Sequence, residues 1–242
     1  MKKFLIVFLG VLASFRILAD GVLCLTFDDK HFVNWCQSLE LLEKYNAHVT
    51  FFVNGKIDDN AVKAMKKLQD AGHSIGLHSQ NHAKAVETCR KLGEADYLQQ
   101  EIFPQLDICN ANGIKIRSFA YPSSQRNEQT DKILFRQFDF LRGNCGKFLR
   151  SDGILTDADE FFTKNVKIKQ FFPGYSLSGD FDMKMIREVM DRAAKENAVI
   201  VFYAHNITPE IAKSHHISVG QLEEVLKHAV KLQMQIKGLN EL

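Results

Sequence analysis

The feature that most constrains the fold is a regular alternation of short apolar runs and helical patterns. Runs of strand length, several of them rich in β-branched and aromatic residues, cover 22–27, 49–53, 74–77, 116–120 and 198–203, and 234–236 could add a last strand. Helical spacing covers 35–45, 58–71, 94–112 and 186–194, and another helix starts at Ser218, where the sequence resembles a capping box. Strands alternating with helices predict an α/β fold with a parallel sheet, either open or closed into a barrel.

The first 19 residues have the layout of a secretory signal peptide. Lys2 and Lys3 precede an apolar run at 4–15, and residues 17–19 offer a cleavage site before Asp20. The run is shorter than the roughly 20 residues that span a bilayer, so no stable membrane span is expected after cleavage. We therefore expect a signal peptide at 1–19, one domain at 20–242, and export to the periplasm or the exterior.

The charge of the chain argues against several kinds of partner. The formal net charge of +2 becomes slightly negative when the three basic residues of the expected signal peptide are removed. A nearly neutral mature chain gives no reason to expect nucleic acid or an anionic membrane as a partner. No CxxC pair occurs among the five cysteines, which excludes the usual cysteine zinc sites. The oligomeric state stays open.

Two polar pairs follow predicted strands and together suggest a metal site. Asp28 and Asp29 end the run at 22–27, and His78 and His82 follow the strand at 74–77. Alone, the acidic pair is more typical of a solvated turn, and the histidine pair is equally typical of a polar loop and of a metal site. Together, two imidazoles and one carboxylate are a standard set for a catalytic divalent metal with open positions, and the second carboxylate is then free to act as a base.

Two further motifs end or begin strands of the same predicted sheet. Arg117 leads the strand at 116–120, which Tyr121 and Pro122 follow, and His205 follows the strand at 198–203. An arginine before a core strand is often a surface residue, and a lone histidine after a strand is often structural. In parallel α/β sheets, however, functional groups gather at the carboxyl ends of the strands, where His205 would join the two polar pairs.

The order TFDD, HSQNH, RSFAYP and YAH resembles the polysaccharide deacetylase family with the NodB homology domain, carbohydrate esterase family 4. The resemblance covers about residues 22–237. It implies a distorted (β/α) barrel and a metal-dependent removal of N- or O-linked acetyl groups from a cell-envelope or extracellular polysaccharide. The implied cofactor is a divalent metal, with zinc favoured and cobalt or manganese as alternatives.

The resemblance also implies a role for each motif residue. Asp28 would be the general base, and Asp29, His78 and His82 would be the metal ligands. Arg117 would orient Asp28, the backbone N–H of Tyr121 would help to hold the oxyanion, and His205 would be the general acid. An acetylated polysaccharide or oligosaccharide is the implied substrate.

The chain departs from the family pattern on the acid side and at the mouth of the site. Lys30 stands where the family has glycine after the paired acids, and no Asp–Trp motif supports the catalytic histidine; Trp35 is the only tryptophan and lies far upstream. Asp180 or Asp182 could take over the tether of His205. His73 matches a structural histidine, and His31 could line the cleft.

Three other functions stay open at this point. The chain could be a relative of the same fold that cleaves a non-sugar C–N bond, or a catalytically impaired glycan-binding protein. Two histidines and one carboxylate could also hold the iron of a non-haem oxygenase. The expected export argues against the first alternative. The presence of Asp28 beside a complete ligand set argues against the binding protein and the oxygenase.

Overall fold

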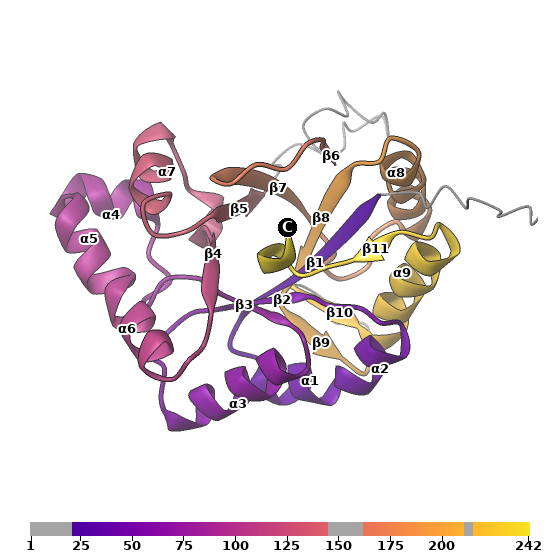
Figure 1. Ribbon diagram of the computed structural model, residues 1–242, viewed down its shortest axis with the longest axis horizontal. Helices are drawn as coiled ribbons and strands as arrows, with labels where there is room; N and C mark the ends of the chain where they lie inside the picture. Colours follow the sequence, from indigo (N-terminus) through magenta and orange to yellow (C-terminus); the bar gives the residue numbers. More distant parts are fainter. Residues whose placement is uncertain (1–20, 145–161, 211–214) are drawn as a thin grey trace, which may run out of the picture.

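Seven parallel strands close into a barrel in the computed structural model, which describes residues 21–144, 162–210 and 215–242 (Figure 1). The strands in barrel order are β1 (Val22–Asp29), β2 (Thr50–Val53), β3 (Ser74–Leu77), β4 (Ile116–Ala120), β5 (Phe140–Asn144), β7 (Gln170–Ser176) and β8 (Val199–Ala204). The pairing of β8 with β1, from Val22↔Val199 to Phe27↔Ala204, closes the ring. The predicted single-domain (β/α) barrel is confirmed.

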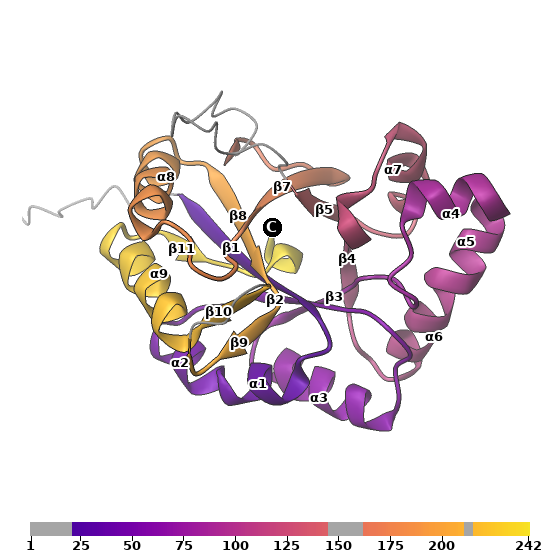
Figure 2. The same cartoon turned by 180° about the vertical axis from the view of Figure 1, so that it is seen from behind.

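Helices surround the ring, and four short strands supplement it (Figures 1 and 2). Parallel β11 (Gln235–Ile236) pairs with β1 and antiparallel β6 (Phe162–Thr163) with β8, while β9 (Asn206–Thr208) and β10 (His216–Ser218) form a separate pair. The helices are α1 (Phe32–Gln37), α2 (Leu39–Lys44), α3 (Asp59–Asp70), α4 (Ala85–Leu92), α5 (Glu94–Glu101), α6 (Phe103–Ala111), α7 (Glu128–Leu134), α8 (Met183–Lys195) and α9 (Val219–Lys231), with single turns η1 (Pro122–Ser124) and η3 (Leu239–Glu241).

The core has two parts because successive strand residues point to opposite faces. The larger part joins the outer strand faces to the helices and includes Leu25 and Phe27 of β1. The smaller part gathers buried residues from strands around the ring and therefore fills its interior; it includes Cys24, Phe52, Phe140 and Phe172, and Leu239 of η3. Asp28 continues the inward-facing series of Cys24 on β1.

Side-chain caps fix the starts of four helices, and Asn127 caps α7 through the Thr130 N–H. Asp58 accepts a hydrogen bond from the Ala61 N–H at the start of α3, and Asp182 caps α8 in the same way through the Lys184 N–H. At α9, Ser218 and Gln221 exchange hydrogen bonds, so the predicted capping box is confirmed.

Two predicted helices are each divided in the structure. The helix expected at 35–45 is α1 and α2, which meet at Ser38, and its hydroxyl donates to the Asn34 carbonyl. The helix expected at 94–112 is α5 and α6, which meet at Ile102, because Pro104 lacks the N–H that a continuous helix would need. The sequence patterns do not predict β5, β7, α4 and α7.

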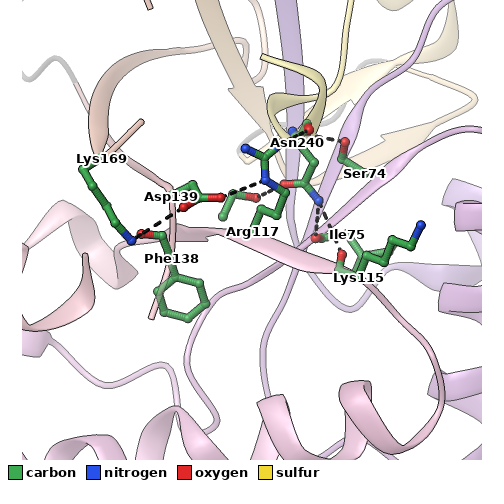
Figure 3. A network of polar contacts seen from close by, with 9 residues as sticks. Ser74, Ile75, Lys115, Arg117, Phe138, Asp139, Lys169 and Asn240 are labelled. Carbon is green, nitrogen blue, oxygen red and sulfur yellow. Dashed lines mark hydrogen bonds and ion pairs between the residues drawn. The ribbon is translucent and has the colours of Figure 1, made fainter. Parts of the chain in front are cut away.

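The C-terminal turn η3 closes the barrel end at which the strands begin. The Leu239 N–H donates to Thr50 at the start of β2, and the Asn240 side chain donates to the Ile75 carbonyl of β3. Figure 3 shows Asn240 within a polar network that also contains Arg117 and Asp139. The candidate site lies at the opposite end of the barrel, where the strands end.

No helix among the described residues is long and apolar enough to cross a membrane. The expected signal peptide at 1–19 lies outside those residues, and its cleavage and the export of the chain stay predictions.

Candidate metal centre and hydrolytic site

The predicted functional residues of three strands meet at one end of the barrel. Asp28 and Asp29 end β1, His78 directly follows β3, and His205 directly follows β8. Because all three strands are parallel, their carboxyl ends lie at the same rim. This is the end at which catalytic groups of (β/α) barrels gather.

Asp29, His78 and His82 form a cluster with the composition of a metal site. One potential ligand atom from each lies within 4.8 Å of the other two, and no other such cluster occurs within 21–144, 162–210 and 215–242. Two imidazoles and one carboxylate suit a tetrahedral divalent metal that keeps a position open for water or substrate. The predicted ligands are therefore brought together, and their donor set fits a metal such as zinc.

His78 is held in the form that a metal ligand requires. Its Nδ1 lies 2.8 Å from the Ala120 carbonyl oxygen, so Nδ1 carries the proton and Nε2 is left with its lone pair. The side chain is buried, and this burial lowers its pKa to about 4. His78 is therefore neutral at neutral pH and can bind a metal without first losing a proton.

Asp29 is oriented by its backbone and by a neighbouring amide. Its φ of 82° lies in the left-handed region, which is uncommon for residues other than glycine. The Asn54 side chain, just after β2, donates to Asp29 Oδ1 at 2.7 Å. One carboxylate oxygen is thereby fixed, and the other is left for a metal.

A buried carboxylate holds the loop that carries the two histidines. Glu101 of α5 accepts hydrogen bonds from the Ser79 hydroxyl at 2.7 Å, the Asn81 backbone N–H at 2.8 Å and the Asn81 side chain at 2.8 Å. Positive φ angles at Ser79 and His82 turn this loop back on itself. Glu101 thus positions His82 without touching the centre, a role hidden in the sequence because Glu101 lies inside a helical pattern.

Asp28 lies beneath the cluster and is paired with Arg142 of β5. Both side chains are almost fully buried, and the Arg142 Nη2 forms an ion pair with Asp28 Oδ1. Burial alone would raise the pKa of Asp28, but the positive charge of Arg142, followed by the influence of His78 and His205, outweighs it and holds this pKa below its usual value. Asp28 is therefore ionised, as a general base must be.

An open cavity of about 520 Å³ leads from the surface to this centre. Asp29 and His82 of the metal cluster line it, together with His205 and Asn54. His31 also lines it, as the sequence analysis allowed, and its Nε2 lies 4.0 Å from Asp29 Oδ2. The arrangement can bind a metal, admit a ligand and place an ionised carboxylate below both.

A family model described as polysaccharide deacetylase matches residues 17–137. The chain belongs to the polysaccharide deacetylase family. Its fold, with catalytic candidates at the carboxyl ends of the barrel strands, agrees with that membership.

Two curated relatives of this polysaccharide deacetylase chain match parts of it. It is 28% identical over 102 residues to a bifunctional xylanase/deacetylase of Pseudobutyrivibrio xylanivorans, which is 42% of this chain and 16% of that protein. It is 32% identical over 85 residues to a peptidoglycan-N-acetylglucosamine deacetylase of Bacillus cereus, which is 35% of this chain and 40% of that protein. The matches thus span less than half the length of these relatives.

The fold also resembles solved structures of the family. The chitin deacetylase of Colletotrichum lindemuthianum superimposes with a TM-score of 0.59 at 15% identity, over 91% of this chain and 86% of that structure. At this identity the likeness supports the fold of the polysaccharide deacetylase chain and nothing finer.

The predicted contact of Arg117 with Asp28 is wrong. Arg117 lies near the start of β4, at the opposite end of the barrel, where its Nε donates to Asp139 at 2.8 Å and its Nη1 to the Asn240 carbonyl (Figure 3). Arg142 of the neighbouring strand β5 pairs with Asp28 instead. Arg142 directly follows the apolar pair Phe140 and Leu141, but the stretch is short and also contains Asp139, so its pattern does not predict a strand.

The predicted oxyanion role of the Tyr121 backbone N–H also disagrees with the structure. This N–H donates to the Arg142 carbonyl at 2.9 Å, in the hydrogen bonding between the ends of β4 and β5. The Tyr121 ring is buried, and its hydroxyl donates to Asp131 at 2.7 Å. The residue therefore braces the rim of the barrel and offers no free donor to a ligand.

His205 lies at the cavity as predicted, but neither proposed aspartate tethers it. Asp182 caps α8, and the buried Nδ1 of His205 has no hydrogen-bond partner among the described residues, Asp180 included. The distant Trp35 of α1 lies beside it instead and donates its indole N–H to the His205 carbonyl at 2.9 Å. Burial lowers the pKa of His205, although Asp28 and Asp29 oppose this effect.

Proposed function

We propose that this chain is a metal-dependent hydrolase that removes N- or O-linked acetyl groups from a cell-envelope or extracellular polysaccharide. The observation that carries the proposal is the buried Asp28–Arg142 pair directly beneath the cluster of Asp29, His78 and His82. A metal site alone is compatible with many activities, whereas an ionised carboxylate held beside it is what water activation needs.

Each residue of the centre has a part in the proposed reaction. Asp29, His78 and His82 would hold the divalent metal, with zinc favoured and cobalt or manganese as alternatives. When bound, the metal would polarise the acetyl carbonyl and make a water molecule more acidic. Asp28 would accept the proton of that water, and Arg142 would fix the carboxylate. His205 would donate a proton to the departing nitrogen or oxygen of the sugar.

The location of the reaction is part of the same proposal. The signal-peptide pattern at 1–19 supports export, and the catalytic domain would be residues 20–242. An exported deacetylase would meet glycans of the envelope or the exterior.

One observation favours a second candidate, a glycan-binding protein with impaired catalysis. The Tyr121 N–H is already hydrogen-bonded, and the His205 ring has no tether among the described residues. Both features weaken the side of the site that stabilises the oxyanion and protonates the leaving group, while the metal ligands and Asp28 are complete.

Acetate release distinguishes the two candidates. The zinc-loaded protein is incubated with N-acetylglucosamine oligomers, peptidoglycan and acetylated xylan, and a chelated sample serves as the control. The hydrolase is expected to release acetate from at least one substrate and to lose this activity on chelation. Binding of a glycan without acetate release, at full zinc occupancy, would support the binding protein and contradict the hydrolase.

A further inference from the structure

A second cavity has a volume of about 570 Å³ and is lined by residues of α1, of α3 and of the turns before them. Four lysines, Lys30, Lys56, Lys63 and Lys67, line it together with apolar side chains that include Phe32. All four lysines are exposed. We call this cavity the lysine groove.

The lysine groove adjoins the metal cavity along two shared segments. After β1, Asp29 and His31 line the metal cavity, whereas Lys30 lines the groove. After β2, Asn54 lines the metal cavity and Lys56 the groove. Adjacent residues of these two short turns thus line different cavities, which places the two cavities on either side of the turns.

The lining of the groove carries a net positive charge, because four lysines stand against one acidic residue. None of its four ammonium groups lies within 4.0 Å of a carboxylate oxygen in the part of the chain that the structure describes. Asp58 is the one acidic residue of the lining, and its carboxylate accepts the capping hydrogen bond of α3. An anionic ligand would therefore meet several free ammonium groups and little repulsion.

The end of the Lys30 side chain lies against Gly55 of the turn after β2. A Cβ atom added to Gly55 would lie 2.8 Å from the Lys30 Cε, and the Gly55 φ of 75° also disfavours a side chain. The glycine therefore leaves room for Lys30 beside this turn. The lysine at the position of the family's glycine is thus part of the groove lining.

We propose that the lysine groove binds an anionic group of the same glycan whose acetyl group reaches Asp28, so that the substrate is an acidic polysaccharide. This inference rests on the proposed function and narrows its substrate class. Apolar side chains beside ammonium groups suit a sugar ring that carries a charge. A lysine ammonium is a point charge that binds carboxylate and phosphate alike, so either anion fits the groove.

Calorimetric titration of the zinc-loaded protein tests the groove. The ligands are a neutral N-acetylglucosamine hexamer, a hyaluronan hexasaccharide that carries glucuronate carboxylates, and a phosphorylated N-acetylglucosamine hexamer. We expect at least one acidic ligand to bind about 10-fold more tightly than the neutral hexamer at low salt, and this preference to fade at high salt. The acidic ligand that binds more tightly identifies carboxylate or phosphate as the source.

Two lysines of one helix provide a matched pair of variants. Lys63→Gln, in the groove, is expected to weaken the affinity for the acidic ligand about 5-fold, as the loss of one exposed charge would. Lys66→Gln removes the same charge from an exposed position of α3 outside the groove and is expected to change nothing. The proposal that the groove binds an anionic group would be overturned if acidic and neutral ligands bound with equal affinity. It would also be overturned if the two variants lost equal affinity for the acidic ligand.

Acetate release from the same ligands separates this inference from the function on which it rests. If binding depends on the lysines but no ligand releases acetate, the anion-binding role of the groove stands and the hydrolase function is contradicted. If acetate is released with no preference for an acidic ligand and no effect of Lys63→Gln, the hydrolase function stands and the anion-binding role is contradicted.

Discussion

Arg142 is the residue on which the proposed chemistry depends most and which the sequence did not reveal. Asp28 and Arg142 lie 114 positions apart in the chain and are both buried, so each leaves an unpaired charge if the other is lost. Replacement by lysine keeps the charge and changes its geometry, which makes it the more informative substitution.

We predict that Arg142→Lys lowers kcat for acetate release by roughly 10- to 100-fold with little change in KM, because the Asp28 carboxylate is no longer fixed. The control is Arg117→Lys, at the far end of the barrel, which should leave kcat unchanged and lower stability by less than about 1 kcal/mol, since its ion pair is partly exposed. Equal effects of the two substitutions on kcat would contradict the assignment of Arg142.

His73 gives the fold a predictable dependence on pH. Its side chain is buried, its Nδ1 accepts the Val49 N–H, and burial lowers its pKa from 6.5 to about 4. The unfolded chain therefore takes up this proton first as the pH falls. The stabilising contribution is complete above pH 6.5 and is lost progressively toward pH 4.

Urea unfolding at several pH values measures this contribution. Between pH 7 and pH 4 the wild type should lose roughly 3 kcal/mol more stability than His73→Gln, the free-energy equivalent of the lowered pKa. Parallel pH profiles for the two proteins would show that His73 is not the group responsible.

The residues that could be predicted from sequence are those whose partners lie in short motifs. The paired acids after β1 and the two histidines after β3 are local patterns, and the parallel strands bring them together. Contacts with distant segments define the roles of Arg142, Glu101 and Trp35. No local spacing in the sequence therefore predicts these roles.

At the scale of the element, β3 requires a glycine where strands crowd inside the barrel. A Cβ atom on Gly76 would collide with the Phe52 ring and lie 2.8 Å from the Ser118 hydroxyl. We predict that Gly76→Ala costs about 1–3 kcal/mol of unfolding free energy by overpacking. Gly220→Ala on α9 is the control, because its Cβ would have no neighbour closer than 3.9 Å. Thermal or urea unfolding that ranks the two variants equally would refute this reading of β3.

Strands β5 and β7 escaped prediction because their sequences break the usual patterns. Residues 140–144 place an arginine and a glycine in an apolar run, and residues 170–176 contain both proline and glycine. Gly174 of β7 is needed where it stands, since a Cβ there would lie 3.0 Å from the Arg142 Cδ. Residues that serve the site therefore break the strand pattern of the two strands that carry them.

In the whole molecule, contacts that stabilise the barrel and residues of the metal cluster lie at opposite ends of the barrel. The turn η3 and the network of Arg117 and Asn240 close one end, and the metal cluster occupies the other. The alternation of strands and helices predicts a parallel α/β sheet, and the family resemblance adds its closure into a barrel. The closing turn could not be predicted, because its contacts reach back to β2, β3 and β4.

We predict that Leu239→Ala, which truncates a fully buried side chain of the barrel interior, costs about 2–5 kcal/mol of unfolding free energy. The zinc affinity of the folded variant should match that of the wild type, because η3 lies at the opposite end from the ligands. Leu92→Ala on α4, 45% exposed, is the control and should cost little. A large loss of zinc affinity in folded Leu239→Ala would show that the two ends are coupled.

The most direct test of the central claim is acetate release by Asp28→Asn at measured zinc content. The substitution keeps the shape of the side chain and spares all three metal ligands, so the variant should bind the same amount of zinc as the wild type. Acetate release should then fall at least about 100-fold, because no base remains to take the proton of water. Release within a few-fold of the wild type, at equal zinc content, would contradict Asp28 as the base and with it the proposed mechanism.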